Sequence, residues 1–178
     1  DIQQKAEAKL LTALKGREDI QKRLLAQASL LQGETLFGDE ETINAQAYLA
    51  AMGLNENAIK RLIPLVQDLA TKNGTDLKSA ADLVAKSVGS STNALSRYGI
   101  TIEGDVGSVD RLESAIEGLN AQVGGQAKAA AEAGIGAATQ FNNAWGDVQE
   151  MIGAKLMPTL TKFFKMMTQA LKTSVQIR

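Results

Sequence analysis

Apolar side chains recur every three or four residues along most of this chain, which is the spacing of one face of an α-helix. Glycines and polar helix-capping residues separate the periodic stretches. The pattern predicts helices over residues 2–32, 39–51, 56–73, 76–89, 92–98 and 108–123, and over 126–175 one long helix or two in line. No strand-like run is long enough to build a sheet, so the predicted fold class is all-α. No fixed-period sequence repeat of the solenoid kind is evident.

Polar residues stand where several of these helices are predicted to begin. Asp39, Asn55 and Ser108 are predicted N-caps, because their side-chain oxygens can accept hydrogen bonds from the free N–H groups of a first helical turn. Gly16 either divides the first helical stretch into two helices or weakens one. Pro64 lies inside the third stretch, where it either kinks the helix or marks its true start.

One passage, residues 100–107, lacks helical spacing. Its apolar and polar residues alternate, which favours an extended segment or a small hairpin. Residues 1–125 are therefore predicted to form a compact bundle of about seven helices that includes this short extended segment. Residues 126–178 are predicted to form a second region, a long C-terminal helix kinked at Pro158.

The end of this last helix carries the most regular apolar stripe in the chain. The stripe covers an arc of about 120° on a helix wheel, opposite lysine side chains. It consists of Leu156, Leu160, Phe163, Phe164, Met167, Leu171 and Val175. Such a stripe predicts contact with partner helices, in the first place those of other copies in a coiled-coil oligomer. A helix lying on an anionic membrane is the alternative.

Composition removes most kinds of chemistry. The 178 residues include no His and no Cys, so thiol catalysis, disulfides, the usual zinc sites and His-based triads are excluded. No metal-ligand cluster or phosphate-binding loop is evident, and we expect no cofactor. Because the first residue is Asp1 and no leader follows it, we also expect the chain to be part of a longer protein.

Charge is unevenly distributed although the net charge is only −1. Residues 99–150 contain eight acidic and two basic residues, whereas residues 151–178 contain five basic and no acidic ones. The overall balance gives no reason to expect nucleic-acid binding. No run reaches the roughly 18 apolar residues that a membrane-spanning helix needs.

One arrangement hints at an enzyme, namely Glu113-Ser114 followed by Glu117. A Glu-Ser pair on a helix resembles lytic transglycosylases and goose-type lysozymes, in which one Glu protonates a glycosidic oxygen. Sugar-binding grooves need aromatic platforms, and no aromatic residue occurs between Tyr98 and Phe141. A solvated helix face is therefore the favoured interpretation, and the chain is predicted not to be an enzyme.

Several short passages, spread over roughly residues 10–165, carry a resemblance to a known family. They are 37–41 (Phe-Gly-Asp-Glu-Glu), 74–81 (Gly-Thr-Asp-Leu-Lys-Ser-Ala-Ala), 93–100 (Asn-Ala-Leu-Ser-Arg-Tyr-Gly-Ile), 134–141 (Gly-Ile-Gly-Ala-Ala-Thr-Gln-Phe), 145–147 (Trp-Gly-Asp) and 153–158 (Gly-Ala-Lys-Leu-Met-Pro). Through these passages, of which 93–100 is the most specific, the chain resembles the tape-measure proteins of phage tails.

The resemblance implies a structural role in the virion. Proteins of this family lie in the lumen of the tail tube, set the length of the tail and assist genome ejection. The partners implied are other copies of the chain, tail-tube proteins and tail-tip or baseplate proteins, with contact to the host envelope during infection. The resemblance implies no cofactor and no sequence-specific binding of nucleic acid.

Overall fold

The fold is described from a computed structural model. The structure describes the backbone of residues 1–176 and the side chains of residues 1–134, 140–154, 158 and 161–170. Within these residues the chain forms helices and connecting turns and no β-strand, which confirms the predicted all-α class. The helices are α1 (Ile2–Ala13), α2 (Glu18–Glu34), α3 (Asp39–Ala51), α4 (Glu56–Asn73), α5 (Leu77–Gly89), the 3-10 helix η1 (Ser96–Tyr98), α6 (Val109–Val123), α7 (Gln126–Glu132) and α8 (Ile135–Gln176).

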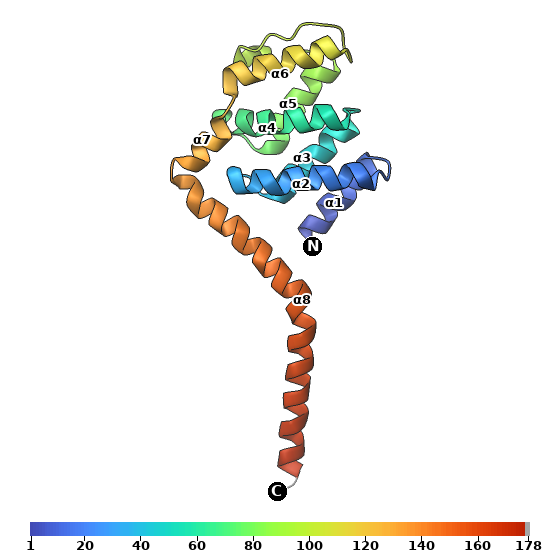
Figure 1. Ribbon diagram of the computed structural model, residues 1–178, viewed down its shortest axis with the longest axis vertical. Helices are drawn as coiled ribbons and strands as arrows, with labels where there is room; N and C mark the ends of the chain where they lie inside the picture. Colours follow the sequence, from blue (N-terminus) through green and yellow to red (C-terminus); the bar gives the residue numbers. More distant parts are fainter. Residues whose placement is uncertain (177–178) are drawn as a thin grey trace. The chain divides into compact units, whose positions relative to one another are not determined.

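The first six α-helices form two layers, and each consecutive pair of helices contributes one helix to each layer. Helices α2, α4 and α6 lie beside one another in one layer (Figure 1), and α1, α3 and α5 pack in sequence in the other. In one layer α1, α3 and α5 begin at Ile2, Asp39 and Leu77, at intervals of 37 and 38 residues, whereas α2, α4 and α6 begin at Glu18, Glu56 and Val109, at intervals of 38 and 53 residues. Stacked helix pairs of this kind are the building units of α-solenoids. The fold therefore repeats at the level of helix pairs although the sequence shows no repeat.

Helix α4 lies at the centre of this arrangement and contacts α2, α3, α5, α6 and α7. Its buried apolar side chains form one broad face of the helix, whereas Asn57, Arg61 and Lys72 on other sides are exposed. Five of these apolar side chains are fully buried: Ile59, Leu62, Ile63, Val66 and Leu69. Burial of each such side chain stabilises the fold by about 1.5–3 kcal/mol.

Pro64 neither begins nor ends α4, which starts at Glu56 and continues to Asn73. A proline has no N–H, so the carbonyl of Lys60, four residues earlier, loses its usual helical donor. The side chain of Gln27 in α2 donates a hydrogen bond to this carbonyl, with Nε2 2.7 Å from the oxygen. The helix therefore passes through Pro64 because a neighbouring helix supplies the missing donor.

Most of the predicted helix starts are confirmed. The side chain of Asn55 accepts a hydrogen bond from the N–H of Ala58, and that of Ser108 caps α6 in the same way. The chain divides at Gly16, which adopts the left-handed region (φ 81°) between α1 and α2. The prediction for Asp39 was wrong by one residue: Gly38 is the N-cap, and its carbonyl accepts the first intrahelical bond, from Thr42.

Residues 90–108 connect α5 to α6 by an irregular path. The predicted helix over 92–98 is reduced to the short η1, and residues 100–107 form neither a strand nor a hairpin. Ile100 and Ile102 nevertheless point into the core, as their alternation predicts. A Cβ atom at Gly104 would come within 2.7 Å of the backbone nitrogen of Arg111, so only glycine allows this close approach.

Arg111 holds this irregular connection in place. Its guanidinium is buried and donates to the carbonyls of Ser87 (2.9 Å), Ser90 (2.8 Å) and Gly104 (3.0 Å). Ser87 and Ser90 lie at the C-terminal end of α5, where the helix dipole favours a positive charge. The arginine thereby joins the end of α5, the connection and the start of α6.

The chain comprises two units, Asp1–Gln140 and Phe141–Arg178. The boundary predicted from the sequence lies after residue 125. Helix α7 belongs to the first unit because it packs against α4. The carboxylate of Asp68 accepts hydrogen bonds from the N–H groups of Gly125 (3.1 Å) and Ala127 (2.8 Å), and thus caps α7 from a distant part of the chain.

The role of Gln27 can be tested by a double-mutant cycle with Pro64. We expect Gln27→Ala to lower the free energy of unfolding by about 1 kcal/mol, because the carbonyl of Lys60 loses its donor. In the Pro64→Ala background the restored backbone N–H bonds that carbonyl, so the same substitution should cost markedly less. Urea unfolding of the four proteins measures the coupling.

Gln21→Ala is the matched control for this cycle. The Gln21 side chain donates to the carbonyl of Glu7 (2.9 Å), which has no relation to Pro64. Its cost should be the same in both backgrounds. Equal costs for Gln27→Ala in the two backgrounds would contradict the assignment.

Candidate functional site

The predicted contact stripe lies on α8, in the second unit. Of its members, Phe163, Phe164 and Met167 have described side chains, and 56%, 61% and 46% of their respective surfaces are exposed. The other four, Leu156, Leu160, Leu171 and Val175, lie outside the residues whose side chains the structure describes. No second element exists among the described residues of this unit, so nothing within it covers the apolar face.

The exposed apolar face of α8 begins before Leu156, the first residue of the predicted stripe. Five large apolar residues upstream of the predicted stripe are also exposed; Phe141, Trp145, Val148 and Ile152 lie near its side of the helix, and Met151 lies away from it. The rings of Phe141 and Trp145 stack with an interplanar angle of 9° and centroids 6.4 Å apart. We call the four residues near the stripe's side, together with the predicted stripe itself, the α8 face.

A sequence signal for the upstream part exists at an 11-residue spacing. Phe141, Ile152 and Phe163 follow one another at this interval, and so do Trp145, Leu156 and Met167. Eleven residues make three turns at 3.67 residues per turn, so the stripe drifts slowly around an ideal helix. Because of this drift, the earlier residues lie beside the arc defined by residues 156–175 and only partly within it.

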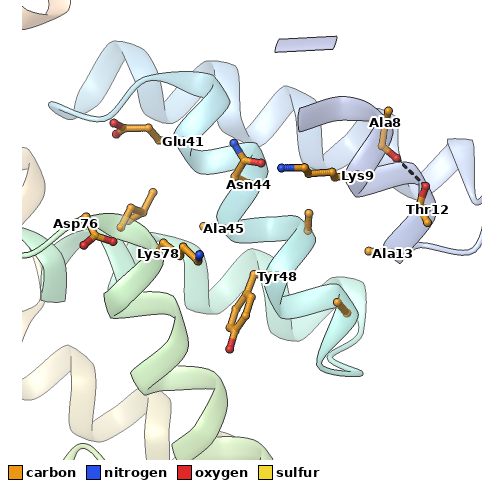
Figure 2. A pocket seen from close by; sticks show the side chains of 13 residues that line it. Ala8, Lys9, Thr12, Ala13, Glu41, Asn44, Ala45, Tyr48, Asp76 and Lys78 are labelled. Carbon is orange, nitrogen blue, oxygen red and sulfur yellow. Dashed lines mark hydrogen bonds between the residues drawn. The ribbon is translucent and has the colours of Figure 1, made fainter. Parts of the chain in front are cut away.

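The first unit carries a separate surface feature, an open groove of about 900 Å³ over the layer formed by α1, α3 and α5. Figure 2 shows Lys9 of α1, Glu41 and Tyr48 of α3, and Asp76 and Lys78 at the start of α5 around it. Small side chains line much of the remaining wall: Ala8, Ala13, Ala45, Ala47 and Ala51. No sequence motif marks this groove, because its walls come from three helices that are far apart in the chain.

Three groups along the groove have displaced pKa values, and one of them is Asp76, whose pKa is lowered by hydrogen bonds from the backbone and hydroxyl of Ser79. Burial raises the pKa of the Glu41 carboxyl, and the negative charges of Glu40 and Asp76 raise it further. The Tyr48 hydroxyl donates a hydrogen bond to Asp82, and this bond raises the pKa of the tyrosine. The groove therefore offers a shaped surface of mixed charge.

The Glu113–Ser114 pair is engaged in structural contacts. Arg61 of α4 binds the Glu113 carboxylate with both terminal nitrogens, at 2.5 and 2.8 Å, and this pairing lowers the pKa of Glu113. The Ser114 hydroxyl accepts a hydrogen bond from the N–H of Glu103 at 2.9 Å. A general acid in glycoside hydrolysis needs a raised pKa, so the environment of Glu113 is unsuited to that role.

Among the described side chains, no group of three or more acidic residues lies close enough together to hold a metal ion. Within the same part of the chain, no helix has the length and hydropathy needed to cross a bilayer. A comparison of the chain with protein-family models, with curated proteins and with solved structures finds no match in any of the three.

The raised pKa of Glu41 predicts a pH-dependent effect of Glu41→Gln. A carboxyl with a folded-state pKa above its unfolded value stabilises the fold when protonated, and this stability is lost as the pH rises through the folded-state pKa. Removing the charge should therefore raise the Tm at pH 7, by about 1–3 °C. The gain should disappear near pH 3.5, where the wild-type carboxyl is protonated.

Glu117→Gln is the control for this measurement, because Glu117 is exposed on α6. Its effect on the Tm should be similar at the two pH values. Thermal unfolding followed by circular dichroism is sufficient. A Tm of Glu41→Gln below that of the wild type at pH 7 would refute the explanation by burial.

Proposed function

We propose that this chain is a non-enzymatic structural protein that assembles with other copies of itself through the α8 face. The observation that carries the proposal is the exposure of aromatic and aliphatic side chains on a helix that has no partner within its unit. Each large side chain buried in a contact contributes about 1.5–3 kcal/mol, so several together can hold an oligomer. A coiled coil with equivalent helices is the arrangement that such a face suits best.

The site of this assembly is proposed to be the lumen of a phage tail or its tip. The support comes from the sequence passages that resemble tape-measure proteins, and an all-helical fold is compatible with them. In this role the protein would set tail length and assist genome ejection, in contact with tail-tube and tail-tip or baseplate proteins. Helix α8 has 42 residues, so it would extend about 60 Å along a tube axis.

Self-association can be tested by sedimentation velocity of the full chain. The wild type should sediment as a dimer or larger oligomer at micromolar concentration. Phe164→Asp should raise the Kd about 30-fold or more, because it places a charge in the centre of the contact. A wild type that stays monomeric at several hundred micromolar would refute the proposal.

Gln169→Asp is the matched control, with the same new charge on the same helix. Gln169 lies nearly opposite the stripe on a helix wheel and is exposed. The substitution should leave the Kd within about two-fold. An equal loss of association in both variants would indicate a general effect on the helix rather than a contact through the α8 face.

A second candidate function is contact with an anionic membrane, which the α8 face also favours. Phe163, Phe164 and Met166 are exposed, and Lys162 and Lys165 lie on the same stretch of helix. Exposed aromatic and methionine side chains with lysines on the other side are typical of helices that lie in a membrane interface. Here the helix would lie on lipid after release and form part of a channel for DNA entry.

Flotation with vesicles tests this candidate. The full chain should bind vesicles of phosphatidylcholine and phosphatidylglycerol at 20 mM salt and be released at 0.5 M salt, where the attraction of the lysines is screened. Vesicles of phosphatidylcholine alone are the control and should bind much less. Absence of binding to the anionic vesicles at 20 mM salt would refute membrane contact.

A further inference from the structure

Nine apolar positions of the α8 face, all its members except Phe163 and Val175, are arranged symmetrically about Leu156. Counted outward from this residue toward the N-terminus, they follow at steps of four, four, three and four residues, and the same steps lead toward the C-terminus. The upstream positions are Ile152, Val148, Trp145 and Phe141, and the downstream positions are Leu160, Phe164, Met167 and Leu171. The pattern therefore reads the same in both directions of the chain.

From this symmetry we propose that α8 pairs with α8 of a second copy in antiparallel orientation, with Leu156 at the two-fold axis. This proposal rests on the self-association proposed above and adds the orientation and register of the pair. In this register each of these nine positions faces another of the nine in the other copy, whereas Phe163 faces Gln149. Trp145 lies opposite Met167, Val148 opposite Phe164, and Ile152 opposite Leu160. A contact of this kind is isologous, so each copy presents the same surface to the other.

The exposure of these side chains is consistent with a surface available for pairing. On the upstream side, 65% of Phe141, 52% of Trp145 and 41% of Ile152 is exposed. On the downstream side, 61% of Phe164 and 46% of Met167 is exposed. Both halves of the proposed contact thus carry uncovered apolar area, and the antiparallel register would bury them against each other.

The charges of α8 distinguish the antiparallel pair from a parallel one. The acidic residues Asp147 and Glu150 precede Leu156 by nine and six residues, and Lys165 and Lys162 follow it by the same numbers. In an antiparallel pair about Leu156 each carboxylate therefore lies at the height of a lysine. In a parallel pair in register, carboxylates meet carboxylates and lysines meet lysines at every height.

This electrostatic preference acts at a distance. On a helix wheel the four charged residues lie away from the apolar stripe, so they form no direct ion pairs across the contact. Opposite charges at equal height still attract when little salt is present, because the Debye length is about 30 Å at 0.01 M salt and about 8 Å at 0.15 M. The apolar symmetry accordingly sets the register, and the charges favour one orientation.

Disulfide trapping tests the orientation directly, because the chain has no cysteine of its own. In the antiparallel register Ile152→Cys in one copy faces Leu160→Cys in the other. A mixture of the two single variants should therefore form a covalent heterodimer on mild oxidation. Each variant alone should not, because its two cysteines would lie about 12 Å apart along the axis, beyond the reach of a disulfide.

Asn143→Cys mixed with Gln169→Cys is the matched control. These positions have equal heights in the proposed register but lie on the side of α8 away from the stripe, so no heterodimer should form. A disulfide in each single variant would show a parallel pair, which overturns the antiparallel proposal and leaves self-association standing. A self-associating wild type that traps no disulfide in any mixture would also overturn it, whereas a monomeric wild type would refute both proposals.

Charge reversal provides an independent test of the same pair. Asp147→Lys with Glu150→Lys places a lysine at all four of these heights, and Lys162→Glu with Lys165→Glu places a carboxylate at all four. At 10 mM salt each double variant should self-associate about five-fold more weakly than the wild type, and a one-to-one mixture should regain the lost affinity. At 0.5 M salt the differences should vanish. Self-association unaffected by either reversal at 10 mM salt would count against the antiparallel pair.

Discussion

The first unit depends on the burial of α4. This helix is in contact with five others, and its fully buried side chains, among them Leu62 and Val66, form the centre of the core. Two of its buried polar side chains make hydrogen bonds: the Gln67 Nε2 donates to the Thr42 hydroxyl at 3.0 Å, although the Gln67 Oε1 is buried without a partner, and Asp68 caps α7. A polar group buried without a partner lowers the free energy of unfolding by about 1–3 kcal/mol, so these hydrogen bonds reduce the cost of placing polar side chains of α4 in the core. The helices around α4 consequently pack so that they cover its buried face.

Local chemistry explains which parts of the fold could be predicted from the sequence. Asn55 and Ser108 were found because a cap depends on a single side chain and its own helix. The continuity of α4 through Pro64 could not be predicted, because the missing donor comes from Gln27 in another helix. The stack of helix pairs was hidden for a similar reason, since equivalent positions are occupied by unlike residues that satisfy different neighbours. Arg111 was missed as well, because its three acceptors are backbone carbonyls that leave no trace in the sequence.

The two surfaces that could bind a partner differ in how visible they are in the sequence. The stripe around Phe163 and Phe164 lies on one helix, so its periodicity is sufficient to detect it. Its extension to Phe141 requires a period slightly longer than that of an ideal helix, and a fixed period misses it. The groove beside Glu41 combines α1, α3 and α5, and no pattern within any one of these helices predicts that they meet. Surfaces built by packing become visible only with the fold.

The layered arrangement of helix pairs has a mechanical consequence. Helix α1 contacts α2 and α3, whereas α6 contacts α4 and α5, so the two ends of the stack are coupled only through the helices between them. A pulling force applied at the N-terminus would therefore strip α1 and then α2 from the stack while α6 is still folded. The extension released at each step would correspond to one helix or one pair, and the resisting force would rise when α4 is reached. A chain built in this way would unfold in stages under tension rather than in one step.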